Sequence, residues 1–475
     1  MAPRTLSAAL AAAALLVLPT PGAGQEYYRD IRPVLVENCV QCHTEGGPAF
    51  SMEDPEEAFR RRATIAAAIL DRRMPPWLAE GGHQEYLGDP SLAEYVVSLV
   101  GEWRAGGFPR GEPRPDPVVT ASHRGHGMHG AFTPDLSLEV LPGDSYLPDP
   151  SMSDDYRCFV VDWTPEERSF ITGFRAVPGN TNVAHHVVIY AVAPAMAERF
   201  RELQEAEEGP GYQCFGGALP DRLGRRGERQ AYEARYPDGL RELNRNNFWL
   251  AHWAPGMDGH VFPAGTGIPM EPGSAVVVQL HYYGAEAPGE RDAGSRLEFM
   301  TAPSVERPAF HMSQTRGDWL AGEQNGSLVI PPGEMATYGM TDDLGDYLGY
   351  IARVTGVEEE RIQGLEVHSA NLHMHAFGHS GVITFQDADG RREILLSVPR
   401  WDLGWQRDFT LVEPKIIPRD RLEGTTLSVQ CTWLNPTDGP IYGGLGSYDE
   451  MCFNFSYVAV QVGDPVSEGG AAGRR

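Results

Sequence analysis

Basic residues are scarce in this sequence compared with acidic ones. There are 39 Lys and Arg against 65 Asp and Glu, which gives a formal net charge of −26. Nucleic acid and anionic membrane surfaces are bound through basic patches, so this balance argues against both as partners. Long apolar runs are also missing after the N-terminus, where no segment could span a bilayer. We therefore expect a protein with no nucleic-acid partner and no membrane span.

The first 24 residues have the pattern of a signal peptide. Arg4 supplies a positive start, Ala8–Leu18 a short apolar run, and small residues precede Gln25. The apolar run is too short for a membrane anchor, and no Cys follows it to carry a lipid. This predicts export to a periplasmic or extracellular space, in which disulfides persist.

Cysteine is rare, with six in 475 residues. Cys39 and Cys42 lie in Cys-Val-Gln-Cys-His, a pattern in which two thioethers hold a haem c and His43 ligates its iron. A redox pair or half of a zinc site would not need a His directly after the second Cys. The motif therefore predicts one covalent haem c. The other four cysteines form an even set that predicts two disulfides: Cys158, Cys214, Cys431 and Cys452.

The second axial ligand of this haem is expected in a later segment. Met74 lies before two prolines, which disfavour helix and can present its thioether rigidly. A thioether ligand would give a high reduction potential. His83 is the alternative, and a haem with two His ligands would have a lower potential.

The N-terminal part of the mature chain predicts a small all-α domain over residues 25–112. Its helical patterns cover Tyr28–Asn38, Asp54–Asp71 and Ser91–Ala105. A Pro-rich linker is expected over 113–131. The linker contains a cluster that could either meet copper transiently or act as a polar tether: His123, His126, Met128 and His129.

From about residue 132 onward, short β-branched and aromatic runs alternate with Gly and Pro turns. This predicts two all-β sandwiches of jelly-roll type in series, over 132–300 and 301–466, before a disordered tail over 467–475. The expected strands cover Phe159–Trp163, His186–Val192, Ala275–Tyr283, Gly381–Gln386, Leu427–Trp433 and Phe453–Val462.

Metal-ligand side chains are concentrated in four separate stretches of this β region. His373 and His375 are two residues apart, so on a strand both would face one way. His185 and His186 would face opposite ways unless their strand ends or bulges. Taken singly, His281 is compatible with a structural residue and Met451 with a core residue.

The order of these stretches resembles the copper type II, ascorbate-dependent monooxygenase family over about residues 156–457. The matching stretches are His185-His186, Trp253-Ala254-Pro255-Gly256, Leu280-His281-Tyr282, His373-Met374-His375 and Asp449-Glu450-Met451-Cys452. The Cys-X-X-Cys-His and Met-Pro-Pro-Trp pair resembles cytochrome c domains fused to bacterial relatives.

The resemblance implies two copper ions per chain, on facing β-sandwiches. An electron-storing site would use His185, His186 and His281. An oxygen-binding, catalytic site would use His373, His375 and Met451. The ligand types agree, because imidazole serves both copper oxidation states and a thioether favours the cuprous ion. Dioxygen, a small organic substrate and an electron donor, either an ascorbate-like reductant or a redox protein, would be the partners.

The resemblance also supports one disulfide within each sandwich, Cys158–Cys214 and Cys431–Cys452. Two positions depart from the family pattern. Asn371 stands where peptide-hydroxylating members have an Arg that holds the peptide carboxylate, and Phe455 replaces a Tyr near the oxygen site. The first departure argues against a peptidylglycine substrate. The alternative function is a non-catalytic copper-binding or electron-transfer protein.

Overall fold

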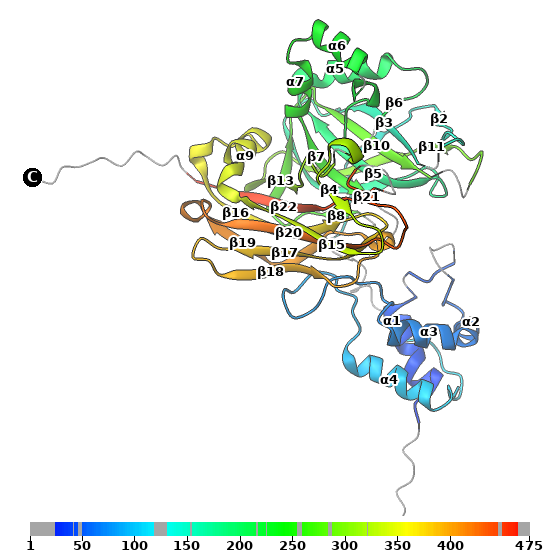
Figure 1. Cartoon of the computed structure of the whole chain (residues 1–475). Helices are drawn as coiled ribbons and strands as arrows, with labels where there is room; N and C mark the ends of the chain where they lie inside the picture. Colours follow the sequence, from blue (N-terminus) through cyan, green and yellow to red (C-terminus); the bar gives the residue numbers. More distant parts are fainter. Residues whose placement is uncertain are drawn as a thin grey trace, which may run out of the picture. The chain divides into compact units, whose positions relative to one another are not determined.

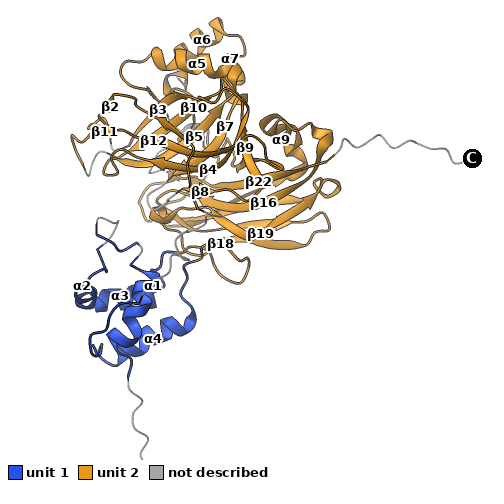
Figure 2. Cartoon of the chain, turned by 180° about the vertical axis from the view of Figure 1, so that it is seen from behind, with its two compact units in different colours: residues 1–76, 90–122 blue, residues 77–89, 123–475 orange. Residues whose placement is uncertain are grey.

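The chain forms two compact units, coloured separately in Figure 2. The computed structural model describes residues 24–463 except 41, 46–49, 118–130, 153, 215–216, 225, 254–258, 284–286, 321 and 445–448. Residues 1–23 of the expected signal peptide, the His/Met cluster of the linker and the tail lie outside the described residues. Unit 1 comprises Met1–Pro76 and Pro90–Ser122, and unit 2 comprises Trp77–Asp89 and His123–Arg475.

Unit 1 is helical in its described part. The three stretches with helical patterns form a π-helical turn (Tyr27–Ile31), α1 (Arg32–Asn38), α2 (Pro55–Arg60), α3 (Arg62–Leu70) and α4 (Glu94–Ala105). The Asp54 side chain accepts a hydrogen bond from the backbone N–H of Glu56 and so caps α2. Tyr27 stacks on Trp103 with ring centroids 5.9 Å apart, and both side chains are fully buried in the core of the unit.

Unit 2 is mostly β-sheet. Its largest sheet has nine strands in the order β1-β12-β4-β9-β13-β22-β16-β19, with β8 paired to β4. These strands are β1 (Leu136–Glu139), β4 (Ser169–Val177), β8 (His260–Val261), β9 (Thr266–Met270), β12 (Arg296–Ala302), β13 (Arg307–Gln314), β16 (Ile362–His373), β19 (Phe409–Pro418) and β22 (Phe453–Val462).

Two smaller sheets lie at opposite ends of unit 2 (Figure 1). One contains β6 (Tyr212–Gln213), β3 (Asp155–Asp162), β10 (Ala275–Tyr282), β5 (Ala184–Val192) and β7 (Asn247–Trp253). The other contains β15 (Met335–Asp343), β20 (Thr426–Leu434), β17 (Gly378–Gln386) and β18 (Arg392–Val398). Two short pairs join β2 (Ser145–Tyr146) to β11 (Asp292–Ala293) and β14 (Val329–Ile330) to β21 (Ile441–Tyr442).

The sheets enclose two hydrophobic cores. One core lies between the five-stranded sheet and the β1-β12-β4-β9 part of the large sheet. The other lies between the four-stranded sheet and the β13-β22-β16-β19 part. A parallel pairing of β9 with β13 joins the two parts. The two β-sandwiches therefore share one continuous sheet. The sequence predicted the two sandwiches, but it predicted them as separate units in series.

The apolar sequence of strand β10 reflects the burial of both of its faces. Val276 and Val278 point into the sandwich core, and Val277 points to the opposite face under a group of helices. All eight residues of β10 are buried. A strand that is covered on both faces is apolar throughout, so the run Ala-Val-Val-Val reflects this double cover. Gln279 and His281 follow Val277 on the face toward the helices.

Five α-helices in the described part of unit 2 were not predicted from the sequence. They are α5 (Pro194–Glu205), α6 (Arg226–Arg235), α7 (Gly239–Arg245), α8 (Gly322–Asn325) and α9 (Leu348–Thr355). Helices α5, α6 and α7 lie together beside the five-stranded sheet (Figure 1). Phe200 and Leu203 of α5 pack with Val277 in one core cluster. No helix among the described residues is both long and apolar enough to cross a membrane.

The segment Trp77–Asp89 belongs to unit 2, although it was predicted within the N-terminal module. The Tyr86 hydroxyl donates to the Leu395 carbonyl at 2.6 Å, and the Gln84 amide donates to the Ile394 carbonyl at 3.0 Å. Trp77 meets Phe409 edge to face at 4.9 Å. These contacts run along the edge of the C-terminal sandwich, so the helical unit is interrupted in sequence.

Candidate metal centres

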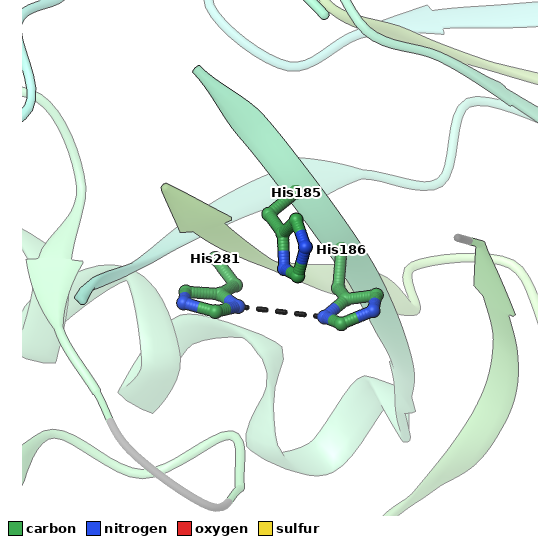
Figure 3. Close-up of side chains that lie close together, drawn as sticks. All are labelled: His185, His186 and His281. Carbon is green, nitrogen blue, oxygen red and sulfur yellow. Dashed lines mark hydrogen bonds between the residues drawn. The ribbon is translucent and has the colours of Figure 1, made fainter. Parts of the chain in front are cut away.

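A β-bulge brings His185 and His186 to the same side of their strand. In the antiparallel pair of β5 with β10, His281 lies opposite His186, and Tyr282 lies opposite Ala184. His185 is the extra residue in this register, and such an insertion re-aims side chains that would otherwise alternate. Figure 3 shows the three imidazoles gathered together, and their ligand nitrogens all lie within 4.8 Å of one another.

The surroundings of His281 select the nitrogen that it can offer to a metal. Its Nε2 lies 2.8 Å from Asp154 Oδ1, and its ring stacks on Tyr156 at 4.2 Å. The carboxylate accepts a hydrogen bond from Nε2–H, so Nδ1 carries the lone pair that can bind a metal. This Nδ1 lies 3.4 Å from His186 Nδ1. The second nitrogen of His281 is therefore held by a carboxylate, as is common for metal-binding imidazoles.

Electrostatics keep His186 neutral. Burial and the neighbouring imidazoles of His185 and His281 lower the pKa of His186 well below its usual value. A neutral imidazole is the form that binds metal. Copper–nitrogen bonds are roughly 2.0 Å long, so nitrogens within 4.8 Å of one another can converge on one ion after small side-chain movements. The residues thus fit a copper ion, because imidazole serves both of its oxidation states.

The second predicted set lies where β16 ends. The strand ends at His373, so His375 is not on a strand, in contrast to the expectation that both face one way along it. Their rings are still close and perpendicular, with centroids 5.2 Å apart. His373 Nδ1 lies 2.5 Å from Gln406 Oε1, and His375 Nδ1 lies 3.0 Å from the Asp449 carbonyl. Each acceptor fixes an Nδ1–H tautomer, in which Nε2 carries the lone pair that can bind a metal.

Glu450, to which the sequence assigned no role, organises the chain around Met451. Its carboxylate is fully buried and accepts hydrogen bonds from the backbone N–H groups of His375 (2.9 Å) and Phe377 (2.6 Å) and from Trp433 Nε1 (2.7 Å). Burial raises the pKa of Glu450 to about 7. One side chain therefore ties the His375 turn to Met451. Its only sequence signal is its place beside Met451 in a stretch that carries the family resemblance.

Both predicted disulfides are confirmed. Cys158 bonds to Cys214 with a Cα–Cα distance of 5.8 Å, and Cys431 bonds to Cys452 with a Cα–Cα distance of 5.9 Å. The second bridge fixes the residue after Met451, which is itself only 8% exposed.

The two predicted ligand sets meet in one cavity of about 590 Å³. Its wall is formed by β5, β7 and β10 on one side and by the adjacent ends of β16 and β22 on the other. All six predicted ligands line it: His185, His186, His281, His373, His375 and Met451. Burial lowers the pKa of His373 to about 3, so this imidazole is also neutral.

A second polar cluster, which the sequence analysis missed, lies beside this cavity. It surrounds a space of about 30 Å³ and comprises His252, His260, His311, His368 and Asp408. Although burial acts to raise it, the pKa of Asp408 is lowered by the nearby His252 and His260, whose Nε2 atoms lie 3.5 and 3.6 Å from its Oδ2. Asn371 donates to Asp408 Oδ1 at 2.9 Å. These histidines carry no short-range spacing signal, because they come from different strands.

Unit 1 contains the residues predicted to hold haem. Cys39 and Cys42 are outside any disulfide, and Cys42 is exposed. His43 is 8% exposed, and its Nδ1 lies 2.8 Å from the Phe50 carbonyl, which leaves Nε2 free for a metal. Gln41 of the motif lies outside the described residues. These side chains would suit a haem c held by Cys39, Cys42 and His43.

The two candidates for the second haem ligand lie in different units. Met74 follows α3 in unit 1, is half-buried, and donates its backbone N–H to the Ala68 carbonyl at 3.1 Å. His83 lies in unit 2, with its Nε2 3.5 Å from Glu80. Met74 therefore shares a compact unit with His43, and His83 does not.

Comparisons with known proteins identify one part of the chain. Residues 145–287 match the family model of the copper type II ascorbate-dependent monooxygenase, N-terminal domain. No curated protein matches the chain.

Similar solved structures include the major capsid protein P2 from bacteriophage PM2, with 8% identity over 70% of this chain and 99% of that chain and a TM-score of 0.26. They also include the VP2 subviral particle of infectious bursal disease virus, with 10% identity over 66% of this chain and 59% of that chain and a TM-score of 0.18. Likenesses this weak bear on neither fold nor function. The family match is the informative comparison: residues 145–287, which contain His185, His186 and His281, are similar to the N-terminal domain of the copper type II ascorbate-dependent monooxygenases.

Proposed function

We propose that the chain is an exported copper-dependent monooxygenase that hydroxylates an organic substrate with dioxygen and takes its electrons through a covalent haem c. The observation that carries this proposal is the single cavity lined by all six predicted copper ligands. The family match covers the three ligands of one set, and the other three come from the remaining half of unit 2.

The two ligand sets have different tasks in this proposal. When bound, copper would supply one-electron storage at His185, His186 and His281, and dioxygen activation at the set that contains Met451. Asp154 holds the His281 ring with Nδ1 facing the cluster, while Gln406 and the Asp449 carbonyl present the Nε2 atoms of the second set. A hydrogen bond at the other nitrogen of a metal-binding imidazole orients the ring and raises its basicity.

The haem part of the proposal rests on unit 1. Cys39 and Cys42 would hold the haem through thioethers, and His43 Nε2 and Met74 would ligate its iron. An ascorbate-like reductant or a redox protein would donate the electrons. Export agrees with the signal-peptide pattern and with two disulfides in unit 2.

Isotope labelling tests the proposed reaction. The copper-loaded, reduced full-length protein is incubated with a panel of small organic compounds under ¹⁸O₂, and products are examined by mass spectrometry. We expect one ¹⁸O atom in a hydroxylated product, and loss of this product in Met451→Ile, which keeps both imidazoles of the oxygen site but loses the thioether. Two bound coppers without any incorporation across the panel would instead support a non-catalytic copper or electron-transfer protein.

A further inference from the structure

The cavity shared by the two ligand sets has no acidic or basic side chain other than imidazole in its described wall. None of the lining residues that the structure describes is Asp, Glu, Lys or Arg. Three carboxylates that bond to residues of the sites are engaged there: Asp154 with His281, Asp408 with Asn371, and Glu450 with backbone N–H groups. None of these three carboxylates is among the lining residues. A charged substrate would therefore find no counter-charge from a protein side chain there.

Three amide side chains of the wall are already bonded to the protein. Asn371 donates to Asp408, and Gln279 donates to the Gly217 carbonyl at 2.9 Å. Gln406 uses its oxygen on His373 and its Nε2 on the Leu403 carbonyl at 3.1 Å. The wall therefore has few amide groups to offer to a ligand.

Aromatic rings form most of the remaining wall. Trp249 stacks on Phe455 with centroids 4.3 Å apart, and Phe455 stacks on Phe453 at 5.3 Å. Tyr190 meets Trp249 edge to face at 5.7 Å. The aromatic lining residues other than His are Tyr156, Tyr190, Phe248, Trp249, Trp253, Tyr350, Phe453 and Phe455. Offset stacks and edge contacts favour a flat ring as the occupant.

We propose that the substrate of this site is an uncharged molecule built around an aromatic ring. The proposal rests on the proposed function for the word substrate, but the binding preference stands on the cavity alone. Removing an ion from water without a partner is costly, whereas a neutral ring gains from leaving water. The volume of about 590 Å³ is in the range of pockets that enclose small organic ligands. Asn371 agrees with an uncharged substrate. It stands where peptide-hydroxylating members of the family have a carboxylate-binding Arg, and its amide donates to Asp408.

A matched series of probes tests the charge preference by calorimetry on the full-length, copper-loaded protein, reduced and without oxygen. The probes are 3-phenylpropanamide, its carboxylate analogue 3-phenylpropanoate, its amine analogue 3-phenylpropylamine, and 3-cyclohexylpropanamide as the ring control. We expect the neutral phenyl amide to bind at least about tenfold tighter than either ion, and tighter than the cyclohexyl amide. Equal or tighter binding of the anion, the cation or the cyclohexyl compound overturns the proposal, as does no binding of the phenyl amide.

Two variants locate the binding in the aromatic wall. Phe455→Leu and Trp249→Leu should each weaken the phenyl amide by roughly five- to tenfold, with unchanged copper content as the check on folding. Tyr95→Leu is the control, because Tyr95 is 75% exposed and lies in unit 1. Unchanged binding in correctly folded Phe455→Leu overturns the proposed location even if Trp249→Leu does not fold. Binding is measured without turnover, so this result and the ¹⁸O result can fail separately.

Discussion

At the scale of single residues, the chemistry of the candidate sites depends on which nitrogen of each imidazole carries the lone pair for a metal. Asp154 occupies Nε2 of His281, whereas Gln406 and the Asp449 carbonyl occupy Nδ1 of His373 and His375. The first set would therefore use Nδ1 of His281, and the second would use Nε2 atoms. The hydrogen-bond acceptors differ as well. A carboxylate accepts from His281 in the first set, whereas neutral oxygens accept from His373 and His375 in the second.

Asp154 gives the first testable consequence. Asp154→Asn removes the negative charge from His281 Nε2 and should weaken copper binding at the His185, His186 and His281 set by about 10- to 100-fold. Competition with a chelator of known affinity measures this loss. Asp149→Asn is the control, because Asp149 is exposed and bonds to Ser151 rather than to a histidine. Equal copper affinity in both variants would mean that the carboxylate does not support the site.

Glu450 gives the second testable consequence. Its carboxylate only accepts hydrogen bonds, and the N–H groups of His375 and Phe377 and Trp433 Nε1 all donate to it. Glu450→Gln would turn an NH₂ group toward one of these donors, so we expect a loss of about 1–3 kcal/mol in unfolding free energy. Cuprous affinity at His373, His375 and Met451 should fall as well.

Chemical denaturation and cuprous competition measure these two effects. Glu413→Gln is the matched control, since Glu413 is an exposed acid of the same unit. If Glu450→Gln left both quantities at the control level, the buried carboxylate would have no positioning role.

The residue types of both sites could be predicted from the sequence, but their supporting contacts could not. His185, His186 and His281 were identified by their order along the chain, and the structure gathers them. Asp154, Glu450 and Asp408 act across strands that are far apart in sequence, and no local spacing indicates such contacts. Polar residues of this kind become visible only after the strands are paired.

At the scale of elements, the strands were predictable and the local irregularities were not. Every expected strand of unit 2 overlaps an observed one, because β-branched runs between turns mark them. The bulge at His185 depends on register with β10, which the sequence of β5 does not contain. Helix α5 was missed although Met196, Phe200 and Leu203 recur at helical spacing, because the whole region was interpreted as β.

The two disulfides close loops of different length, and only the second adjoins Met451. Removing each one should therefore change the unfolding free energy and the cuprous affinity to different extents. The pair Cys158 and Cys214 is 56 residues apart in sequence, and the pair Cys431 and Cys452 is 21 residues apart. Loop-closure entropy predicts that replacing the first pair by Ser costs about 1 kcal/mol more unfolding free energy than replacing the second. The second pair adjoins Met451, so its loss should weaken cuprous binding more.

Each double variant serves as the control for the other, with denaturation and cuprous competition measured on both. The crossed pattern is the expected result. If the Cys158 and Cys214 variant lost more cuprous affinity at the Met451 set, the assignment of the second bridge as the support of Met451 would be wrong.

At the scale of the whole molecule, the sequence predicted sandwiches in series, and the structure joins them through one nine-stranded sheet. The join is the parallel pairing of β9 with β13, which involves only a few residues of each strand. Pairing between strands is not encoded by local periodicity, so it could not be anticipated. The same holds for Trp77–Asp89, whose apolar residues serve unit 2 rather than the helices beside which they lie in sequence.

The presence of a haem motif and copper ligands in one chain leads to the last prediction. Hydroxylation needs two electrons, and a haem c passes one at a time. A tethered haem unit has a raised effective concentration at its partner, so it could replace a freely diffusing reductant. In the copper-loaded protein, oxygen should therefore reoxidise ferrous haem faster when a compound that the protein can hydroxylate is present. Stopped-flow absorbance of the haem measures the rate.

Two controls make the result specific to the copper sites. Copper-free protein lacks the proposed acceptor, and His375→Ala keeps the His185, His186 and His281 set but removes one ligand of the proposed oxygen-binding set. Both should show slow reoxidation that does not respond to substrate. Equal rates in all three proteins would mean that the haem does not supply the copper sites. A substrate response in His375→Ala equal to that of the unaltered protein would place oxygen reduction away from His373, His375 and Met451.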